Sequence, residues 1–322
     1  MSVGLAIDAL IAVGFASLAV RVVTGRRLFA DIVTFVVFGL VVSLAWARLG
    51  SPDLALAEAA IGAGLTGALM LVAYRSLARG GWTPTPTEGR SSPVAAAIGV
   101  LTTTAVAAIG VAAVGAAGEG VAPDSAGAAA LRSLDGTGLG NPVTAVLLLF
   151  RNLDTLLEMY VLLVVLLGTW AVATPVREGV RARVPRDSPL VGALVGIVVP
   201  TAVLVSFHLL LAGTDRPGGA FQGGTVLAAA GVVLVLTGAM RARSRSSLRL
   251  RLALIAGVAT FVAIGAGAPL IGAAPLELPG LWAVYLIEVA MMTSIATTLL
   301  LLFTRSRGVG ATEADAGAEG GR

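Results

Sequence analysis

Nine stretches of roughly 20 apolar residues, separated by short polar segments, dominate this sequence. A backbone inside a bilayer has no water to bind, so a chain crosses it only as helices of about 20 residues or as strands of a closed barrel. These runs are too long for barrel strands. The pattern predicts an all-α polytopic integral membrane protein with about nine transmembrane helices. The expected spans cover residues 3–22, 29–47, 53–73, 93–113, 143–173, 190–212, 221–240, 250–272 and 280–304.

Composition agrees with a membrane solvent and narrows the chemistry. The chain is 57% hydrophobic and 12% charged, whereas charged residues make up about a quarter of a soluble domain. It has no cysteine and one histidine, which excludes disulfides, iron–sulfur ligation and thiolate zinc sites, and leaves no imidazole cluster for a metal. No nucleophile–base pair is apparent. We therefore expect no cofactor and no enzymatic activity.

The 22 basic residues are all arginines and indicate orientation. In a soluble protein the net charge of +4 would suggest nucleic acid, but most of these arginines lie between apolar runs, so we expect no nucleic-acid partner. With the N-terminus outside, 18 arginines are cytoplasmic, Arg151 lies near the outer membrane edge, and only Arg48, Arg132 and Arg216 are external. This bias predicts an external N-terminus and a cytoplasmic C-terminus in the cell membrane.

Two polar stretches, 75–92 and 174–189, interrupt the apolar runs. They are expected to be cytoplasmic linkers, and the Gly/Ala-rich stretch 114–141 is expected to be an external loop. The run 143–173 is too long for one perpendicular span and contains Arg151, which predicts a short broken piece before the true span. The predicted segments are 1–80 with three helices, 93–175 with two helices, 188–305 with four helices, and a disordered tail over 306–322.

Seven candidate residues inside the expected spans, six acids and the histidine, need a physical reason to be there, because a charge near the bilayer centre costs about 2.5–3.5 kcal/mol on insertion scales. Asp8 and Asp31 lie close to span ends, where their side chains are expected to reach the interface. In the predicted orientation the other five lie in the outer half of the membrane. We hypothesise that they line or flank the outward-facing end of an ion path. They are Glu58, Asp154, Glu158, His208 and Glu288.

Glu58 lies about five residues into the third expected span, roughly 7 Å below its outer end. This span is rich in small residues, with Ala59, Ala63 and Gly67 at a four-residue spacing. Small residues at this spacing let neighbouring helices approach closely and shield the carboxylate from lipid. In the alternative interpretation, Glu58 is a helix-start acid whose carboxylate reaches the outer interface.

Asp154 and Glu158 are four residues apart and share one helical face. Two such carboxylates in a membrane titrate as a coupled unit, and a unit of this kind can exchange a proton for a sodium ion. Arg151 could pair with Asp154 and leave Glu158 as the group that changes state. In the alternative, the ion pair is interfacial and Glu158 only bonds a neighbouring helix.

Glu288 and His208 are the two remaining candidates. Glu288 is the deepest carboxylate, roughly 12 Å from the outer end of its span, and no partner for it is visible in the sequence. His208 follows an expected kink at Pro200. A single membrane histidine more often bonds a neighbouring helix than relays protons, although its titration range makes proton transfer feasible.

A glycine-rich segment, AGTDRPGGAFQGG, connects two of the spans. It lacks the GK[ST] sequence of a phosphate loop and opens a transmembrane helix, so nucleotide binding is not expected. Proline followed by glycines favours a tight turn, and glycines at a helix start permit close packing. An architectural role is therefore predicted for Pro217, Gly218, Gly219, Gly223 and Gly224.

Three segments resemble known families, and they occur in family order. SPDLALAEAAIG (51–62) resembles a motif in the C-terminal part of the large A subunit of Mrp-type sodium/proton antiporters, also found in a small subunit of membrane-bound hydrogenases. NPVTAVLLLFRNLDTLLEMYVLL (141–163) is similar to the segment that follows it. PGGAFQGG (217–224) resembles the signature of the Mrp B subunit and of its hydrogenase counterpart, with Ala220 in place of a usual third glycine.

The resemblance implies that the C-terminal part of the Mrp A subunit is fused to the Mrp B subunit in a single polypeptide. It implies a membrane subunit that works with separate antiporter-like proton-pumping subunits and small membrane subunits, with Na⁺ and H⁺ as the transported ions. Carried over by motif, Glu58, Asp154 and Glu158 would be ion-path residues. Two alternatives stay open: an ion-translocating subunit of a membrane-bound hydrogenase or related redox complex, which the FQGG sequence favours, and a purely structural scaffold.

Overall fold

The computed structural model describes residues 3–25, 27–79, 125–172, 189–240 and 247–306, with a few isolated positions between 97 and 108. The described part is helical, and seven of its helices are long and apolar enough to cross a membrane, with α10 as a shorter apolar helix. The prediction of an all-α polytopic membrane protein is therefore confirmed. The expected span 93–113 lies outside the described residues, so the count of nine spans and the orientation stay predictions.

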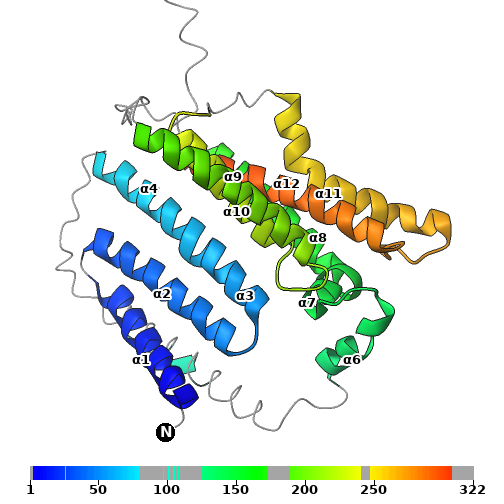
Figure 1. The fold of residues 1–322 in the computed structure, drawn as a ribbon, viewed down its shortest axis with the longest axis horizontal. Helices are drawn as coiled ribbons and strands as arrows, with labels where there is room; N and C mark the ends of the chain where they lie inside the picture. The colour runs from blue at the N-terminus through cyan, green and yellow to red at the C-terminus, as the bar shows by residue number, and fades with distance from the viewer. Residues whose placement is uncertain are drawn as a thin grey trace, which may run out of the picture.

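The helices that correspond to the expected spans begin and end close to the predicted positions. The third expected span is one continuous rod made of α3, the π-helical segment η1 and α4 (Figure 1). The helices are α1 (Val3–Thr24), α2 (Leu28–Arg48), α3 (Pro52–Ala57), η1 (Glu58–Leu65), α4 (Thr66–Arg79), α8 (Asn152–Val172), α9 (Pro189–Ala212), α10 (Ala220–Leu236), α11 (Leu248–Gly267) with the 3₁₀ turn η4 (Ala268–Ile271), and α12 (Leu281–Ser306).

The break expected before the span at 152 is present. Helix α7 (Pro142–Ala145) continues into the π-helical segment η3 (Val146–Phe150), which ends at Arg151. Arg151 has φ −134° and ψ 40°, outside the helical region, and α8 begins at the next residue. The two pieces remain in contact, because the Thr155 hydroxyl of α8 donates to the Leu147 carbonyl of η3 at 2.7 Å.

The expectation of a loop over 114–141 is wrong for its second half. Helix α6 (Ala126–Arg132) and the 3₁₀ turn η2 (Leu134–Gly136) lie there. The Ser125 side chain accepts the Ala128 amide at 3.2 Å and so caps α6. A serine cap followed by alanines favours a helix even in a stretch with several glycines.

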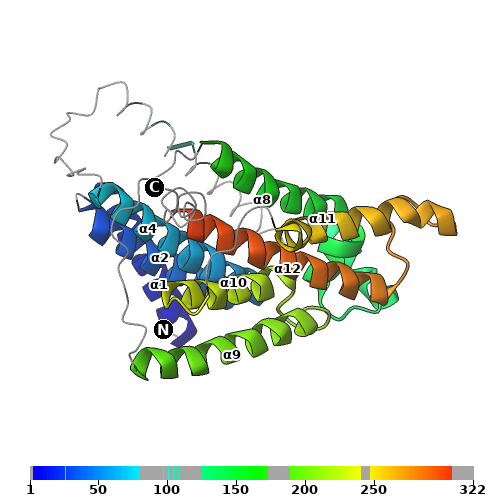
Figure 2. The same ribbon diagram turned by 90° about the horizontal axis from the view of Figure 1, so that it is seen from above.

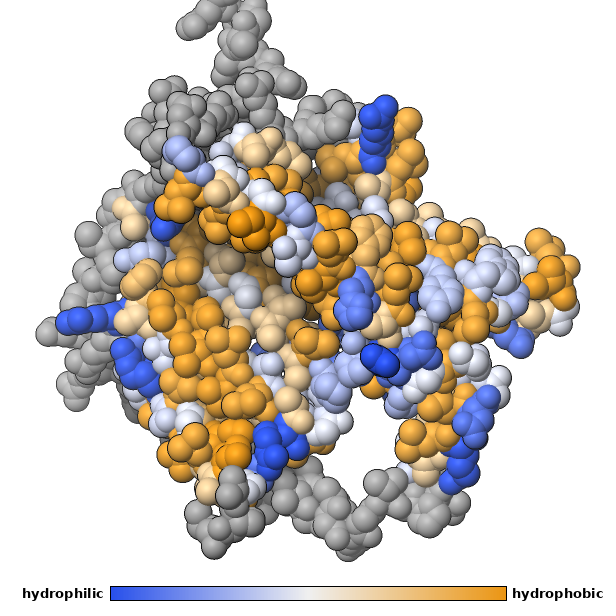
Figure 3. Space-filling view, viewed as in Figure 1, coloured by the Kyte–Doolittle hydropathy of each residue, from blue (hydrophilic) through white to orange (hydrophobic). Residues whose placement is uncertain are grey.

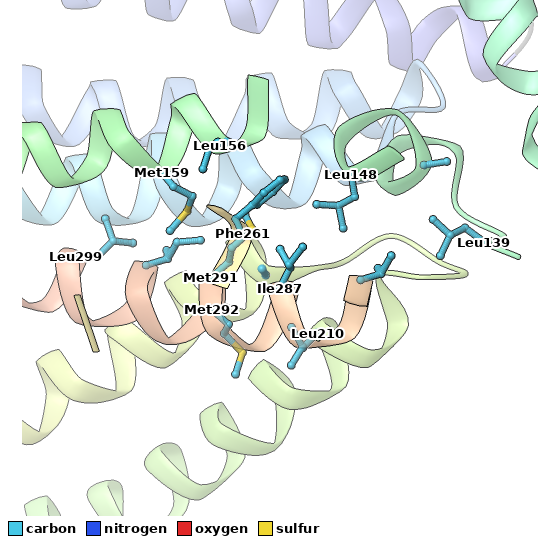
Figure 4. Packing of buried hydrophobic residues seen from close by; sticks show 14 of the residues in the cluster. Leu139, Leu148, Leu156, Met159, Leu210, Phe261, Ile287, Met291, Met292 and Leu299 are labelled. Carbon is cyan, nitrogen blue, oxygen red and sulfur yellow. The ribbon is translucent and has the colours of Figure 1, made fainter. Parts of the chain in front are cut away.

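Helix α12 is the centre of the structure. It packs against α8, α10 and α11, and 56% of its span is buried inside the chain, against 28% or less for the other spans. Figure 4 shows Met159 of α8 and Phe261 of α11 meeting Ile287 and Met291 of α12. More than half of the α12 span is therefore covered by other helices of this chain and not by lipid.

The first three spans form a separate layer. Helix α1 packs on α2, and α2 packs on the α3–η1–α4 rod, which touches α10 and α12 (Figure 1). A Cβ on Gly39 of α2 would lie 3.0 Å from the Ala63 Cβ of η1, so small residues bring these helices close. Helix α9 lies at the edge of the bundle (Figure 2), and the outer faces of the helices are largely apolar (Figure 3).

Candidate functional site

Asp53 joins three segments that are far apart in the sequence. It is only 7% exposed. Its Oδ1 accepts the Gly218 amide at 3.0 Å and the Asn141 side-chain amide at 3.3 Å. Its backbone carbonyl accepts the Gln222 side-chain amide at 3.3 Å. We call Asp53, Asn141, Gly218 and Gln222 the Asp53 hub, and it brings the three sequence motifs together at one point.

Local sequence explains how the hub forms. Asp53 lies in the first turn of α3, directly after Pro52, a residue suited to the start of a helix. Asn141 is the N-cap of α7: its Oδ1 accepts the Val143 amide at 2.9 Å. That bond fixes the side-chain amide so that its nitrogen faces Asp53 and also donates to the Arg216 carbonyl at 3.0 Å.

The glycine-rich segment forms the turn between α9 and α10, and neighbouring backbone packs closely against it. Gly219 has φ 112°, a conformation that L side chains rarely adopt. A Cβ on Gly218 would collide with the Leu209 carbonyl of α9. Thr144 of α7 donates its hydroxyl to the Gly213 carbonyl at 2.5 Å and so holds the turn from the other side.

Glycines at the start of α10 allow it to touch two helices. A Cβ on Gly223 would lie 2.8 Å from the Ser206 carbonyl of α9, and one on Gly224 would lie 2.9 Å from the Ile295 side chain of α12. The Ser206 hydroxyl donates to the Gly223 carbonyl at 2.6 Å. This geometry is what an architectural role of these glycines requires.

Glu288 of α12 faces the same turn. It is 4% exposed. The Ala220 amide at the N-terminus of α10 donates to its carboxylate, and a Cβ on Gly219 would lie 3.3 Å from its Oε1. Its other oxygen, Oε2, is buried without a hydrogen-bond partner. The partner that the sequence did not reveal is thus a helix N-terminus, whose positive dipole end favours a carboxylate.

Glu58 begins the π-helical segment η1, five residues after Asp53, and is partly buried. Its carboxylate lies against Gly62, one turn further along the same rod, at the position that a Cβ on that glycine would occupy. Within the described residues no hydrogen bond or ion pair engages this carboxylate.

Asp154 and Glu158 lie on the outward face of α8. Arg151 Nη2 is 2.6 Å from Asp154 Oδ2, with side-chain exposures of 70% and 45%, so the predicted pairing of Arg151 with Asp154 is present. Glu158 is exposed, as are Leu157 and Val161 beside it on α8, and no ion pair engages it within the described helices. The structure therefore places these two acids on a surface of this chain rather than in its interior.

His208 is also exposed. It lies on α9 between Ser206 and Leu210, which are both buried against α10 and α12, and its own side chain points away from that contact. The chain by itself therefore brings Glu288 and Asp53 to one turn, keeps Glu58 a short distance along the rod, and leaves His208, Asp154 and Glu158 on outward faces. A shared ion path through all five stays a prediction.

Comparisons with known proteins give two family matches. Residues 12–79 match the MbhD family model, described as the D subunit of MBH. Residues 190–306 match the MnhB model, a domain related to the MnhB subunit of Na⁺/H⁺ antiporter. No curated protein matches the chain.

One solved structure extends the likeness over nearly the whole chain. A chain in the structure of the Mrp complex from Dietzia sp. DQ12-45-1b superposes with a TM-score of 0.72 and 24% sequence identity. The match covers 95% of this chain and 35% of that chain. The likeness shows a common fold, and this chain spans about a third of the longer one.

Proposed function

We propose that this chain, which matches the MbhD model over residues 12–79 and the MnhB-related model over residues 190–306, serves as a membrane subunit of a multisubunit sodium/proton antiporter of the Mrp type in the cell membrane. Its partners would be the antiporter-like proton-pumping subunits and small membrane subunits of that complex. Its own contribution would be carboxylates on the ion path.

One observation carries the proposal: the two domains meet at the Asp53 hub. Asp53 comes from the MbhD match, while Gly218 and Gln222 come from the MnhB match. Glu58 follows Asp53 by five residues on the same rod, and Glu288 faces the turn that contains Gly218. The hub therefore links the rod that carries Glu58 to the turn that Glu288 faces, as an ion path across both matched segments would need.

The mechanism we propose is alternate occupancy by a proton and a sodium ion at Glu58 and at the Asp154/Glu158 pair. An ionised acid within a bilayer costs several kcal/mol, so it binds a proton or a dehydrated cation in preference to standing empty. Asp154 and Glu158 lie on an otherwise apolar outward face. A polar face of a neighbouring protein in the complex would cover them there and complete the path.

The test is exchange by the assembled complex in membrane vesicles. Glu58→Gln and Glu158→Gln are each expected to lower sodium-driven proton movement by about tenfold or more, because an amide neither releases a proton nor neutralises a cation. Glu277→Gln is the matched control, since Glu277 is exposed in the connection between α11 and α12. Normal exchange by assembled Glu58→Gln and Glu158→Gln complexes would leave the purely structural scaffold as the function.

Gly62→Ala tests whether Glu58 needs the space that Gly62 leaves. The new methyl group would push the Glu58 carboxylate from its position, while alanine is the better helix former. We expect a several-fold change in the sodium concentration that half-saturates exchange, with no loss of thermal stability. Gly168→Ala on α8, where a Cβ meets nothing within 4 Å, should change neither. Equal sodium dependence in both variants would contradict a role for this space.

A second candidate is the ion-translocating subunit of a membrane-bound hydrogenase or related redox complex. The observation that favours it is the MbhD match, whose description names MBH. Purification of the native complex distinguishes the two. Iron–sulfur and nickel subunits that co-purify with this chain would support the redox complex, and their absence together with sodium/proton exchange would support the antiporter.

A further inference from the structure

Two buried carboxylates hold the turn Arg216–Ala220. Among the described residues, Asp53 and Glu288 are the only acids that are buried. Asp53 binds the Gly218 amide and Glu288 binds the Ala220 amide, two residues further along. Gly219, between them, has the left-handed φ that turns both amides toward acids. The two acids belong to different domains and meet through one short piece of backbone.

Glu288 differs from Asp53 because half of its carboxylate has no partner. Oε2 is buried with no donor near enough to bind it. A buried carboxylate oxygen without a hydrogen bond is costly, and a neutral carboxylic acid is far cheaper to bury than an ion. The free oxygen is therefore the place where a proton would be held.

The surroundings of Glu288 suit a proton and not a sodium ion. A hard cation needs several oxygen ligands, as calcium and magnesium sites illustrate. The group bound to Glu288 is instead an N–H at the start of α10, the positive end of that helix. The Ser206 hydroxyl already donates to a carbonyl of α10, and Gln222 uses its side-chain amide on Asp53.

We propose that Glu288 is a proton-binding site that excludes Na⁺. For its physiological role this inference rests on the proposed antiporter function.

Several other charged and titratable groups on the surrounding elements are engaged elsewhere or exposed. Asp215 accepts the Thr214 hydroxyl at 3.1 Å, and Asp154 is paired with Arg151. His208 and Glu158 are exposed on α9 and α8. The remaining groups are Arg216 in the turn, Glu58 on η1, Tyr285 one helical turn before Glu288, and Arg249 and Arg251 near the start of α11.

Infrared difference spectroscopy of the purified complex, titrated from alkaline to acid pH, tests the proposal without requiring transport. We expect a C=O band of a protonated carboxylic acid that is lost in Glu288→Gln and kept in the control Glu277→Gln. Saturating Na⁺ at constant pH should leave the band unchanged.

Each opposite result overturns the proposal. A band that persists in Glu288→Gln shows that the proton is held elsewhere, and a band that Na⁺ removes shows that the site takes the cation. If Glu288→Gln does not assemble, Glu288→Asp is measured instead. The C=O band should then change its frequency, because the protonated group is an aspartic acid in place of a glutamic acid. A normal band in a complex that exchanges no sodium would refute the proposed function and leave the proton site intact.

Discussion

Asp53→Ala is expected to prevent the assembly of a stable complex. The substitution removes the acceptor of two buried donors, the Gly218 amide and the Asn141 side-chain amide. Each buried donor left without an acceptor costs about 1–3 kcal/mol, and native proteins have only about 5–15 kcal/mol to lose. The melting temperature of the detergent-solubilised complex, and the amount of this chain that co-purifies with its partners, measure the effect.

Asp135→Ala and Asp53→Asn separate this effect from the loss of a charge. Asp135 is exposed in the 3₁₀ turn η2, so its removal should leave the melting temperature unchanged. Asparagine at position 53 keeps an oxygen for the Gly218 amide and should cost only about 1 kcal/mol. A complex with Asp53→Ala that melts at the same temperature as one with Asp135→Ala would show that the hub does not hold the two domains together.

The features that could be predicted from the sequence depend on local pattern. Apolar runs place the spans, because every spanning backbone must be satisfied within its own helix. The break before α8 follows from an arginine within a run that is too long, and the Arg151–Asp154 pair from a spacing of three residues on one helix. Two of the three short motifs, at 51–62 and 217–224, lie within the MbhD and MnhB matches, whereas the motif at 141–163 lies outside both.

The Asp53 hub was beyond such reasoning because it depends on contacts across the fold. Asp53 and Asn141 are 88 residues apart in the sequence, and Asp53 and Gly218 are 165 apart. In the sequence, Asp53 resembles any acid in the first turn of a helix. Its one signal was that it belongs to the same motif as Glu58, and that signal gives no partner.

The sequence also did not predict whether each acid faces the interior of the fold or its surface. A membrane helix is apolar on every side, so its pattern does not distinguish a buried face from one that meets lipid or another protein. Glu288 turns inward and finds the start of α10, whereas Glu158 and His208 turn outward on α8 and α9. The depth of a residue along a span can be predicted from the sequence. The direction in which its side chain points depends on the helices that pack against the span.

Gly223→Ala is expected to separate α9 from α10. The new Cβ would lie 2.8 Å from the Ser206 carbonyl and 3.2 Å from the Met292 sulfur, so α9 cannot keep its position on one side while α12 limits movement on the other. Over-packing of this kind costs about 1–3 kcal/mol. Moving α9 away also breaks the hydrogen bond from the Ser206 hydroxyl to the Gly223 carbonyl, which adds about 1 kcal/mol.

The matched control for this prediction is Gly196→Ala, which makes the same chemical change on α9 where a Cβ meets nothing within 4 Å. In an open helical position alanine should be neutral or stabilising by up to about 1 kcal/mol, so the melting temperatures of the two complexes should diverge. Because α10 begins at the turn that binds Glu288, Gly223→Ala should also reduce ion exchange, while Gly196→Ala should not. If both substitutions leave stability and exchange alike, α9 and α10 do not touch at Gly223, and the architectural role of the glycine-rich segment is refuted.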